Sequence, residues 1–325
     1  RNPEFDFSRP VDGSDPATDW QGLHTVDESI LILNPENGWI QNCNSTPFTA
    51  AGPYSPKAEN YPNYMAPDQE NFRGIHAVKV LQNVEKLNLD SFLALAHDPY
   101  LPAFEYLIPE LEQAFLTAGK GKENLKEAVD LLAAWDYRTG LNSISMTLAH
   151  FYGENYQRRF RSMNRFINPS NGKAPEAKEI LEVLEETIAK MDADFGTWKT
   201  PWGEINRFQR LSGDIELKYD DNKPYVPVPY ASGNWGALAA YGARTFDGTK
   251  RLYGYRGNSF VAVVEFGEKV RAKTILAGGQ SSDPNSPHFF DQTQRYADTN
   301  FKEAAYYRED VEKREEERYQ PGKRK

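Results

Sequence analysis

Apolar side chains recur at helical spacing through the middle of the chain. The clearest runs are Ala103–Ala118 and Leu125–Trp135, where apolar residues return every three or four positions. Another run begins after Pro175, which the first turn of a helix tolerates. Its apolar stripe consists of Ala177, Ile180, Leu181, Leu184, Ile188 and Met191. Asp90 is placed to cap a shorter helix, so we expect residues 72–195 to be mostly helical.

After residue 200 the pattern changes to short runs rich in β-branched and aromatic residues. Asn258–Phe266 and Val270–Ala277 are two such runs, and Gly267–Lys269 joins them, which predicts a hairpin. Tyr225–Pro229 is expected to be extended, because its two prolines restrict the backbone. Helices followed by short strands predict the α+β class.

The last segment, Phe301–Tyr319, is predicted to be a helix that Pro321 and Gly322 end. Ala304, Tyr307 and Val311 would share one side of it. Its dense mixed charge is typical of a solvated surface helix rather than a basic binding arm.

The first 67 residues are rich in Pro, Asn, Gly and aromatic residues. Ser29–Leu33 is a strand candidate and Trp39–Asn42 is a second one. Between them, Asn34–Gly38 is a turn signal, because Asn-Gly supplies the positive φ angles of a tight hairpin turn. Prolines then keep the backbone extended and irregular as far as Pro67. A long ordered loop of this kind is usually functional.

Composition excludes several classes of function. The 325 residues carry 47 acidic and 38 basic side chains, a net charge of −9, which argues against a nucleic-acid-binding surface. The longest apolar runs, such as Phe260–Val264, are too short to span a bilayer. Cys43 is the only cysteine, so neither an internal disulfide nor a cysteine cluster for zinc can form. The histidines at 24, 76, 97 and 150 have no metal-ligand spacing.

Two asparagines follow the predicted turn and are candidates for chemistry. The side-chain amide of Asn42 or Asn44, fixed at a strand end, would be a preorganised donor for a developing oxyanion. Alternatively, both side chains satisfy backbone groups of the loop. A third interpretation is that Asn44-Ser45-Thr46 is a glycosylation acceptor. Ser286, His288 and Asp291 do not predict a catalytic triad, because three residues within six positions cannot generally converge on one reacting atom.

Four segments, in order, resemble the penicillin acylase family of N-terminal-nucleophile hydrolases. They are Trp20-Gln21-Gly22, the segment Asn34–Pro47, Phe72-Arg73-Gly74-Ile75, and Gly278–Ser281 followed by Ser286-Pro287-His288 and Asp291-Gln292. Arg244–Val264 is more similar to the acyl-homoserine-lactone and aculeacin-type members than to penicillin G acylase. The resemblance implies part of an αββα sandwich with a large helical insertion. It assigns residues 1–300 to the C-terminal portion of an acylase β-chain, with an active-site hairpin and loop in 1–70, helices in 72–195, strands in 200–290, and a charged helix in 301–325.

The resemblance also implies a mechanism. In this family an autocatalytic cut exposes an N-terminal serine, whose own α-amino group, with a pKa of about 7.7–8.0, serves as the base. The chain begins with Arg1, so we expect the nucleophile in an upstream β-chain portion. That portion and the α-chain of the same precursor are the expected partners, and residues 1–325 alone are expected to be inactive.

Three residues carry expected roles by position in the family. Asn44 matches the oxyanion-hole asparagine, with Asn42 as the alternative register, and Arg73 matches the arginine that orders that asparagine and the terminal amine. From the residues alone, Arg73 could instead pair with a carboxylate such as Glu70. Glu265, the lone acid of the strand Phe260–Phe266, is the third, because some acylases pair a histidine near the nucleophile with such a glutamate. A strand glutamate more often faces outward.

The implied activity is hydrolysis of the amide bond of N-acylated small molecules, either acyl-homoserine lactones or penicillin-type β-lactams. The alternative is a non-catalytic binding or structural module derived from this fold.

No cofactor is required, but family members hold a structural calcium ion, to which the carbonyl near Phe7 could contribute. The family's carboxylate ligand falls near Ser55, where no acid stands, so calcium stays open. A periplasmic or secreted bacterial location is implied, without nucleic-acid or membrane partners.

Overall fold

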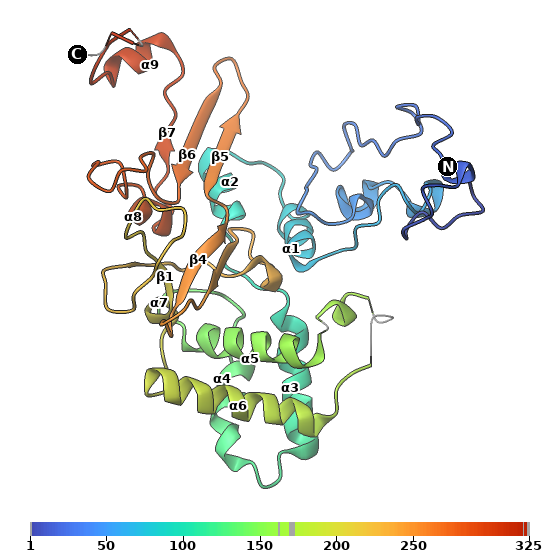
Figure 1. The fold of residues 1–325 in the computed structure, drawn as a ribbon, viewed down its shortest axis with the longest axis vertical. Helices are drawn as coiled ribbons and strands as arrows, with labels where there is room; N and C mark the ends of the chain where they lie inside the picture. Colours follow the sequence, from blue (N-terminus) through green and yellow to red (C-terminus); the bar gives the residue numbers. More distant parts are fainter. Residues whose placement is uncertain (1, 162, 169–172, 321, 324–325) are drawn as a thin grey trace.

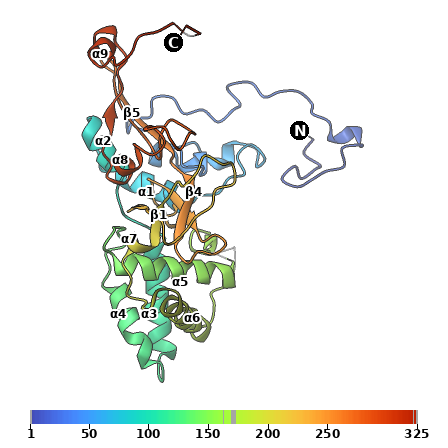
Figure 2. The ribbon, with the colours of Figure 1, turned by 60° about the vertical axis from the view of Figure 1, so that its left-hand side comes forward.

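In the computed structural model, a layer of helices lies beneath two small sheets, and the segment before α1 extends away from both (Figures 1 and 2). The structure describes residues 2–161, 163–168, 173–320 and 322–323. Its helices are α1 (Phe72–Leu81), α2 (Leu89–Ala96), α3 (Phe104–Ala118), α4 (Lys126–Ala133), α5 (Ile144–Phe160), α6 (Ala177–Phe195), α7 (Trp202–Ile205), α8 (Thr293–Ala297) and α9 (Arg308–Lys313). None of the helices in the described residues has the length and apolar character that crossing a membrane requires.

The helical prediction for residues 72–195 is confirmed, because α1 to α6 all fall within it. The predicted stripe of α6 packs into the main core, where Leu181 and Leu184 are fully buried against α3 and α5. The cap of α2 was assigned to the wrong residue. Asn88, not Asp90, accepts the N–H groups of Asp90 and Ser91, because it stands before the first turn.

The strands form two sheets, as the sequence pattern predicts for residues 200–290. The first contains β1 (Asn206–Phe208), β2 (Val226–Pro227), β3 (Tyr241–Arg244) and β4 (Leu252–Gly257) in the order β2-β1-β4-β3. The second contains β5 (Phe260–Glu265), β6 (Arg271–Leu276) and β7 (Lys302–Glu303) in the order β5-β6-β7. β5 and β6 pair antiparallel from Phe260↔Leu276 to Glu265↔Arg271, which confirms the predicted hairpin.

Both strands predicted before residue 70 are wrong. Residues 2–71, as described, contain no strand at Ser29–Leu33 or Trp39–Asn42. The turn between them does form, because Gly38 N–H donates to Pro35 O at 2.9 Å. Ser29–Leu33 has no strand opposite it among the described residues, and the Leu33 side chain is 77% exposed. Trp39–Asn42 makes a backbone contact, from Gln41 N–H to Ala50 O at 2.8 Å, but this does not continue into a ladder. A β-propensity run becomes a strand only where another backbone satisfies its hydrogen bonds.

The C-terminal helix is shorter than the predicted Phe301–Tyr319. Lys302 and Glu303 form β7 at the edge of β6, and only Arg308–Lys313 is helical. These residues form a strand rather than a helix because the edge of β6 supplies partners for their backbone groups. Ala304 N–H extends the pairing by donating to Ala272 O. A separate unit at residues 301–325 stays a prediction.

One buried indole fixes the loop between the helices and the first sheet. Trp235 ends the short 3-10 helix η8 (Gly233–Trp235) and is fully buried. Its Nε1 donates to His150 Nδ1 of α5 at 3.0 Å, and its ring lies so close to Gly153 that a Cβ there would be 2.7 Å away. The next carbonyl, Gly236 O, lies 2.8 Å from His76 Nδ1 of α1. η8 is therefore held between α1 and α5.

The buried His150 makes stability depend on pH. Complete burial lowers the pKa of its imidazole to about 4, whereas an unfolded histidine titrates near 6.5. The unfolded chain therefore takes up a proton that the native state does not, so stability is full above about pH 6.5 and falls as the pH drops toward 4, by about 3 kcal/mol in total.

Urea unfolding at several pH values tests this expectation. His150→Gln keeps an acceptor for Trp235 but cannot titrate, so its stability should depend less on pH than that of the parent. His288→Gln is the control for loss of an exposed imidazole, and His150→Gln should reduce the dependence more than it does. Parallel pH curves for the parent and His150→Gln would contradict the assignment.

Candidate active site

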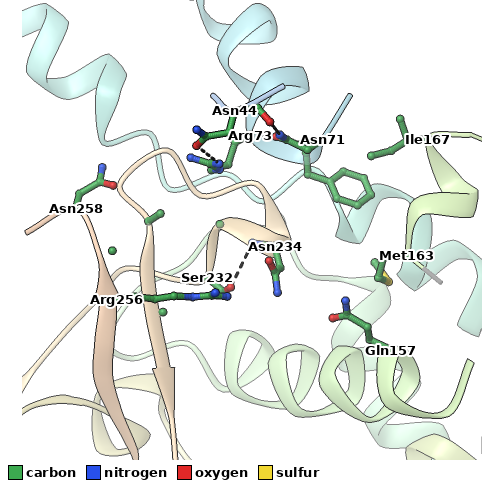
Figure 3. A pocket seen from close by; sticks show the side chains of 15 residues that line it. Asn44, Asn71, Arg73, Gln157, Met163, Ile167, Ser232, Asn234, Arg256 and Asn258 are labelled. Atoms are coloured by element: carbon green, nitrogen blue, oxygen red, sulfur yellow. Dashed lines mark hydrogen bonds between the residues drawn. The ribbon is translucent and has the colours of Figure 1, made fainter. Parts of the chain in front are cut away.

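A pocket of about 530 Å³ lies where the start of α1, the η8 loop and the end of β4 meet (Figure 3). Its lining residues are Asn44, Asn71, Phe72, Arg73, Gln157, Met163, Ile167, Ser232, Gly233, Asn234, Ala240, Gly242, Arg256, Gly257 and Asn258. Two residues predicted from the sequence, Asn44 and Arg73, are therefore in the same pocket, although 29 positions separate them.

Asn71 ties the Asn44 loop to the first turn of α1. Its Oδ1 caps the helix by accepting Gly74 N–H at 3.0 Å. Its Nδ2 donates to Cys43 O at 3.1 Å and to Asn44 O at 3.0 Å. Asn44 itself has a φ of 54°, a left-handed conformation that asparagine tolerates better than most residues. One side chain thus holds the loop and the helix in a fixed relation.

Arg73 fixes the orientation of the Asn44 amide. Its Nη2 donates to Asn44 Oδ1 at 2.9 Å (Figure 3). A guanidinium has only donors, so the amide must present its oxygen to Arg73 and turn its NH₂ away. Within the part of the chain that the structure describes, the Asn44 Nδ2 has no hydrogen-bond acceptor. A free donor therefore lies at the rim of the pocket.

The alternative partner for Arg73, Glu70, is engaged elsewhere. Glu70 accepts hydrogen bonds from the Thr49 hydroxyl and from Asn71 N–H. No ion pair within 4.0 Å joins Glu70 to Arg73 among the described residues. The stem of Arg73 instead lies against Gly233, where a Cβ would be 3.0 Å from its Cδ. Glycine at position 233 gives Arg73 the room to reach Asn44.

The other predicted asparagine, Asn42, has a supporting position. Its Oδ1 accepts Asn44 N–H at 2.9 Å, so it satisfies a backbone group of the loop. Asn42 therefore satisfies a backbone group of the loop, whereas Asn44 lines the pocket.

Glu265 does not line this pocket, and its expected pairing with a histidine upstream of residue 1 stays a prediction. It lies at the far end of β5, where its carboxylate is 3.5 Å from the Arg271 guanidinium across the hairpin. Five residues of strand, about 17 Å at 3.3–3.4 Å per residue, separate it from Phe260 next to the pocket-lining residues. Glu265 lies on the same face of β5 as the buried Val263, at the partly exposed end of the strand.

The described lining of the pocket supplies no general base. It includes neither a histidine nor a carboxylate. Burial raises the pKa of the nearby Cys43 thiol, which keeps it protonated at neutral pH. His288 Nδ1 and the Asp291 carboxylate lie 3.0 Å apart on the surface, away from this pocket. The pocket therefore offers donors and positive charge rather than a nucleophile.

Calcium binding stays a prediction, to which Ser55 adds no support. The Ser55 hydroxyl accepts Ala51 N–H at 2.9 Å and closes a turn of the loop. No three His, Cys, Asp or Glu side chains in the described ranges are grouped so that they could hold a metal. Calcium prefers six to eight oxygen ligands, including carboxylates, and Ser55 provides no carboxylate.

Sequence reasoning missed Asn71, Gly233 and Arg256. Asn71 had a readable signal, because asparagine directly before an apolar-periodic run is an N-cap signature. Gly233 and Arg256 had no such signal. Both lie more than 150 residues after Arg73 in the sequence, and only tertiary contacts bring them to the pocket.

Comparisons with known proteins agree on one family. A family model described as penicillin amidase matches residues 1–313. The acyl-homoserine lactone acylase PvdQ of Pseudomonas putida is 25% identical over 310 residues, which cover 88% of this chain and 37% of that protein. PvdQ of Pseudomonas savastanoi pv. phaseolicola is 25% identical over 246 residues, covering 71% and 30%. The chain spans about a third of the length of these curated relatives.

One solved structure shows the same fold. The thermostable penicillin G acylase from Alcaligenes faecalis matches with a TM-score of 0.52 and 17% identity over 93% of this chain and 60% of that chain.

The hydrogen bonds from Asn71 to Cys43 O, Asn44 O and Gly74 N–H form a clamp between the Asn44 loop and α1. Two substitutions should separate its effect on the loop from its effect on the helix. Asn71→Asp keeps the oxygen that caps α1 but removes the NH₂ that holds Cys43 O and Asn44 O. Its unfolding free energy should fall by about 2 kcal/mol with the two lost hydrogen bonds, and Asn71→Ala should lose about 1–2 kcal/mol more with the cap. In Asn71→Asp, amide hydrogen exchange in residues 41–46 should accelerate about 30-fold, as expected for two lost hydrogen bonds of about 1 kcal/mol each.

Asn88→Asp is the matched control for this experiment. Asn88 caps α2 through its oxygen, so the substitution should not change exchange in residues 41–46. Unchanged exchange in Asn71→Asp, or equal acceleration in the control, would contradict the clamp.

Proposed function

Because the chain belongs to the penicillin amidase family, whose model matches residues 1–313, we propose that it is part of an enzyme that hydrolyses the amide bond of N-acylated small molecules. Acyl-homoserine lactones and penicillin-type β-lactams are the two proposed substrate groups. The first is favoured by the relatives, two acyl-homoserine lactone acylases at 25% identity.

The proposal depends most on one observation, the contact between Arg73 and Asn44 at the rim of the pocket. Arg73 Nη2 binds Asn44 Oδ1 at 2.9 Å and so leaves the Asn44 NH₂ directed away from the cation. A neutral donor held in this way is suited to the negative charge that develops on an amide oxygen during attack. The positive charge of Arg73 polarises the same amide and strengthens its N–H donor.

The proposed nucleophile is an N-terminal serine from a part of the precursor outside residues 1–325. Its Oγ attacks the substrate carbonyl carbon, and its own α-amino group takes the hydroxyl proton, since an α-amine with a pKa of about 7.7–8.0 is partly unprotonated at neutral pH and can accept one. The C–N bond then breaks, the leaving amine takes the proton, and an acyl-serine ester remains. Water hydrolyses the ester through a second tetrahedral intermediate.

In both tetrahedral intermediates the Asn44 NH₂ donates to the oxyanion. Arg73 is a positioning residue, because it acts through Asn44, and Asn71 fixes the backbone of the same loop. The proposed partners are the upstream β-chain portion and the α-chain of the precursor, and the proposed location is the periplasm or the exterior of a bacterium.

The proposed origin of the nucleophile predicts where activity is found. Residues 1–325 expressed alone should not hydrolyse an acyl-homoserine lactone, whereas the protein expressed from its complete gene should. The measurement is single-turnover release of the amine. Acylation by residues 1–325 alone would contradict the proposed nucleophile, and no activity from the complete gene would favour the non-catalytic alternative.

The role of Asn44 predicts a loss in kcat without a loss of folding. Removal of one oxyanion donor typically costs about 2.7–4 kcal/mol, or roughly 10²–10³ in kcat. Asn44→Ala in the complete protein should show this loss in steady-state kinetics. Its KM should change little, because the contact strengthens only in the transition state.

Asn42→Ala is the matched control, since Asn42 binds the backbone of Asn44 but does not line the pocket. It should reduce turnover less than Asn44→Ala. If Asn44→Ala keeps kcat within a few-fold of the parent while Asn42→Ala abolishes turnover, Asn42 is the oxyanion donor and the assignment is wrong.

A further inference from the structure

The second arginine of the pocket, Arg256, is a cation without a close counter-charge. It lies near the end of β4 and is exposed. Among the described residues, its side chain has no hydrogen bond and no ion pair within 4.0 Å, and its guanidinium lies 5.2 Å from the ring centre of Tyr255. Burial raises the pKa of the Glu154 carboxyl on α5, and the charges of Arg158 and Arg256 partly oppose this rise, but no ion pair within 4.0 Å joins Arg256 to Glu154 among the described residues. The guanidinium is therefore available to a ligand.

The backbone directs Arg256 across the floor of the pocket. Gly242 of β3 is its cross-strand partner, and a Cβ at Gly242 would be 2.7 Å from Arg256 Cγ and 3.0 Å from its Nε. The stem thus lies flat on Gly242, and in Figure 3 the side chain extends toward Ser232 and Asn234. Any larger residue at position 242 would push the guanidinium out of this position.

Both arginines of the pocket lie on small residues of the same floor. Arg73 packs on Gly233, as Arg256 packs on Gly242, and the Ala240 Cβ would be 3.4 Å from a Cβ at Gly233. The floor is further fixed by Asn258 N–H, which donates to Ala240 O at 3.0 Å. Small side chains here leave space above the floor that both cations border.

The electrostatic character of the pocket is positive. Its described lining contains two arginines, five neutral amide side chains and no carboxylate. Arg73 already donates to Asn44, so Arg256 is the cation that remains for a ligand. A planar guanidinium binds a carboxylate through two parallel hydrogen bonds, which a neutral ester oxygen cannot match. An apolar acyl chain gains nothing from an unpaired cation, so the group that faces Arg256 belongs to the polar half of the substrate.

We propose that Arg256 binds a carboxylate on the amine half of the substrate, so that the enzyme prefers N-acyl amino acids over neutral N-acyl lactones. This inference rests on the proposed amide hydrolysis in the same pocket. It favours amine halves that carry a carboxylate, as penicillin-type β-lactams do, over the neutral lactones that the relatives suggest. Arg256 is a specificity-determining residue, with its guanidinium on the carboxylate while the Asn44 NH₂ faces the scissile carbonyl.

The direct test compares two substrates that differ by ring opening. N-decanoyl-homoserine has a free carboxylate, and N-decanoyl-homoserine lactone has the same acyl chain and no charge. In the protein from the complete gene, kcat/KM should be higher for the open form. Arg256→Met, which keeps the stem on Gly242, should lower kcat/KM for the open form by about 10- to 100-fold, the range of one or two charge-assisted hydrogen bonds. It should change kcat/KM for the lactone less than about threefold.

Two further variants sharpen this test. Arg244→Met removes a guanidinium from the end of neighbouring β3, where it stacks on Phe246 and Tyr255 outside this pocket, and should leave both substrates unaffected. Arg256→Lys should restore part of the preference, because it keeps the charge but not the bidentate geometry. Equal losses for both substrates in Arg256→Met, or a carboxylate preference that survives it, would overturn the proposal.

A binding measurement separates this proposal from the proposed function. Calorimetric titration with N-acetylglycine requires no hydrolysis, so it tests the carboxylate site even if neither substrate is cleaved. Arg256→Met should weaken binding at least about tenfold while Arg244→Met does not. Equal binding by the parent and Arg256→Met would overturn the carboxylate site. Binding as expected without cleavage of either substrate would contradict the proposed hydrolase alone.

Discussion

The candidate site depends on a hydrogen bond that can be made in only one way. Arg73 has only donors, so Asn44 must offer it an oxygen, and the NH₂ of the same amide is left for the pocket. The other features of the site preserve this contact. Asn71 holds the loop that carries Asn44, and Gly233 leaves room for the arginine stem. The proposed oxyanion donor is therefore oriented before any substrate arrives, which is the condition for electrostatic preorganisation.

Trp235 anchors the η8 loop, which packs against Arg73 and so supports its contact with Asn44. Its indole packs on α5 beside Gly153 and binds His150, and the adjoining Gly236 carbonyl meets His76 of α1. The loop with Gly233 is thereby attached to the same helix that carries Arg73. Segments that are distant in sequence converge here because a buried, hydrogen-bonded core fixes their relative positions. The helical layer thus acts as the support of the pocket as well as the main hydrophobic core.

Local patterns predicted the parts of the fold that local forces decide. The helices between 72 and 195 and the β5–β6 hairpin follow from periodicity, and the family resemblance, now confirmed by the family match, brought Asn44 and Arg73 into one site. The α+β class is confirmed as well. Strands before residue 70 were wrong because propensity cannot show whether a partner strand is present. Arg256 could not be predicted, since only the pairing of β4 with Gly242 places it in the pocket.

A double-mutant cycle between Asn44 and Arg73, measured as kcat in the protein from the complete gene, tests the central claim most directly. If Arg73 acts by orienting Asn44, Arg73→Met loses its effect once the amide is gone. The double variant with Asn44→Ala and Arg73→Met should then be within about threefold of Asn44→Ala alone, which corresponds to a coupling energy close to the whole effect of Arg73→Met. Losses that multiply, so that each substitution costs the same whether or not the other is present, would contradict the account.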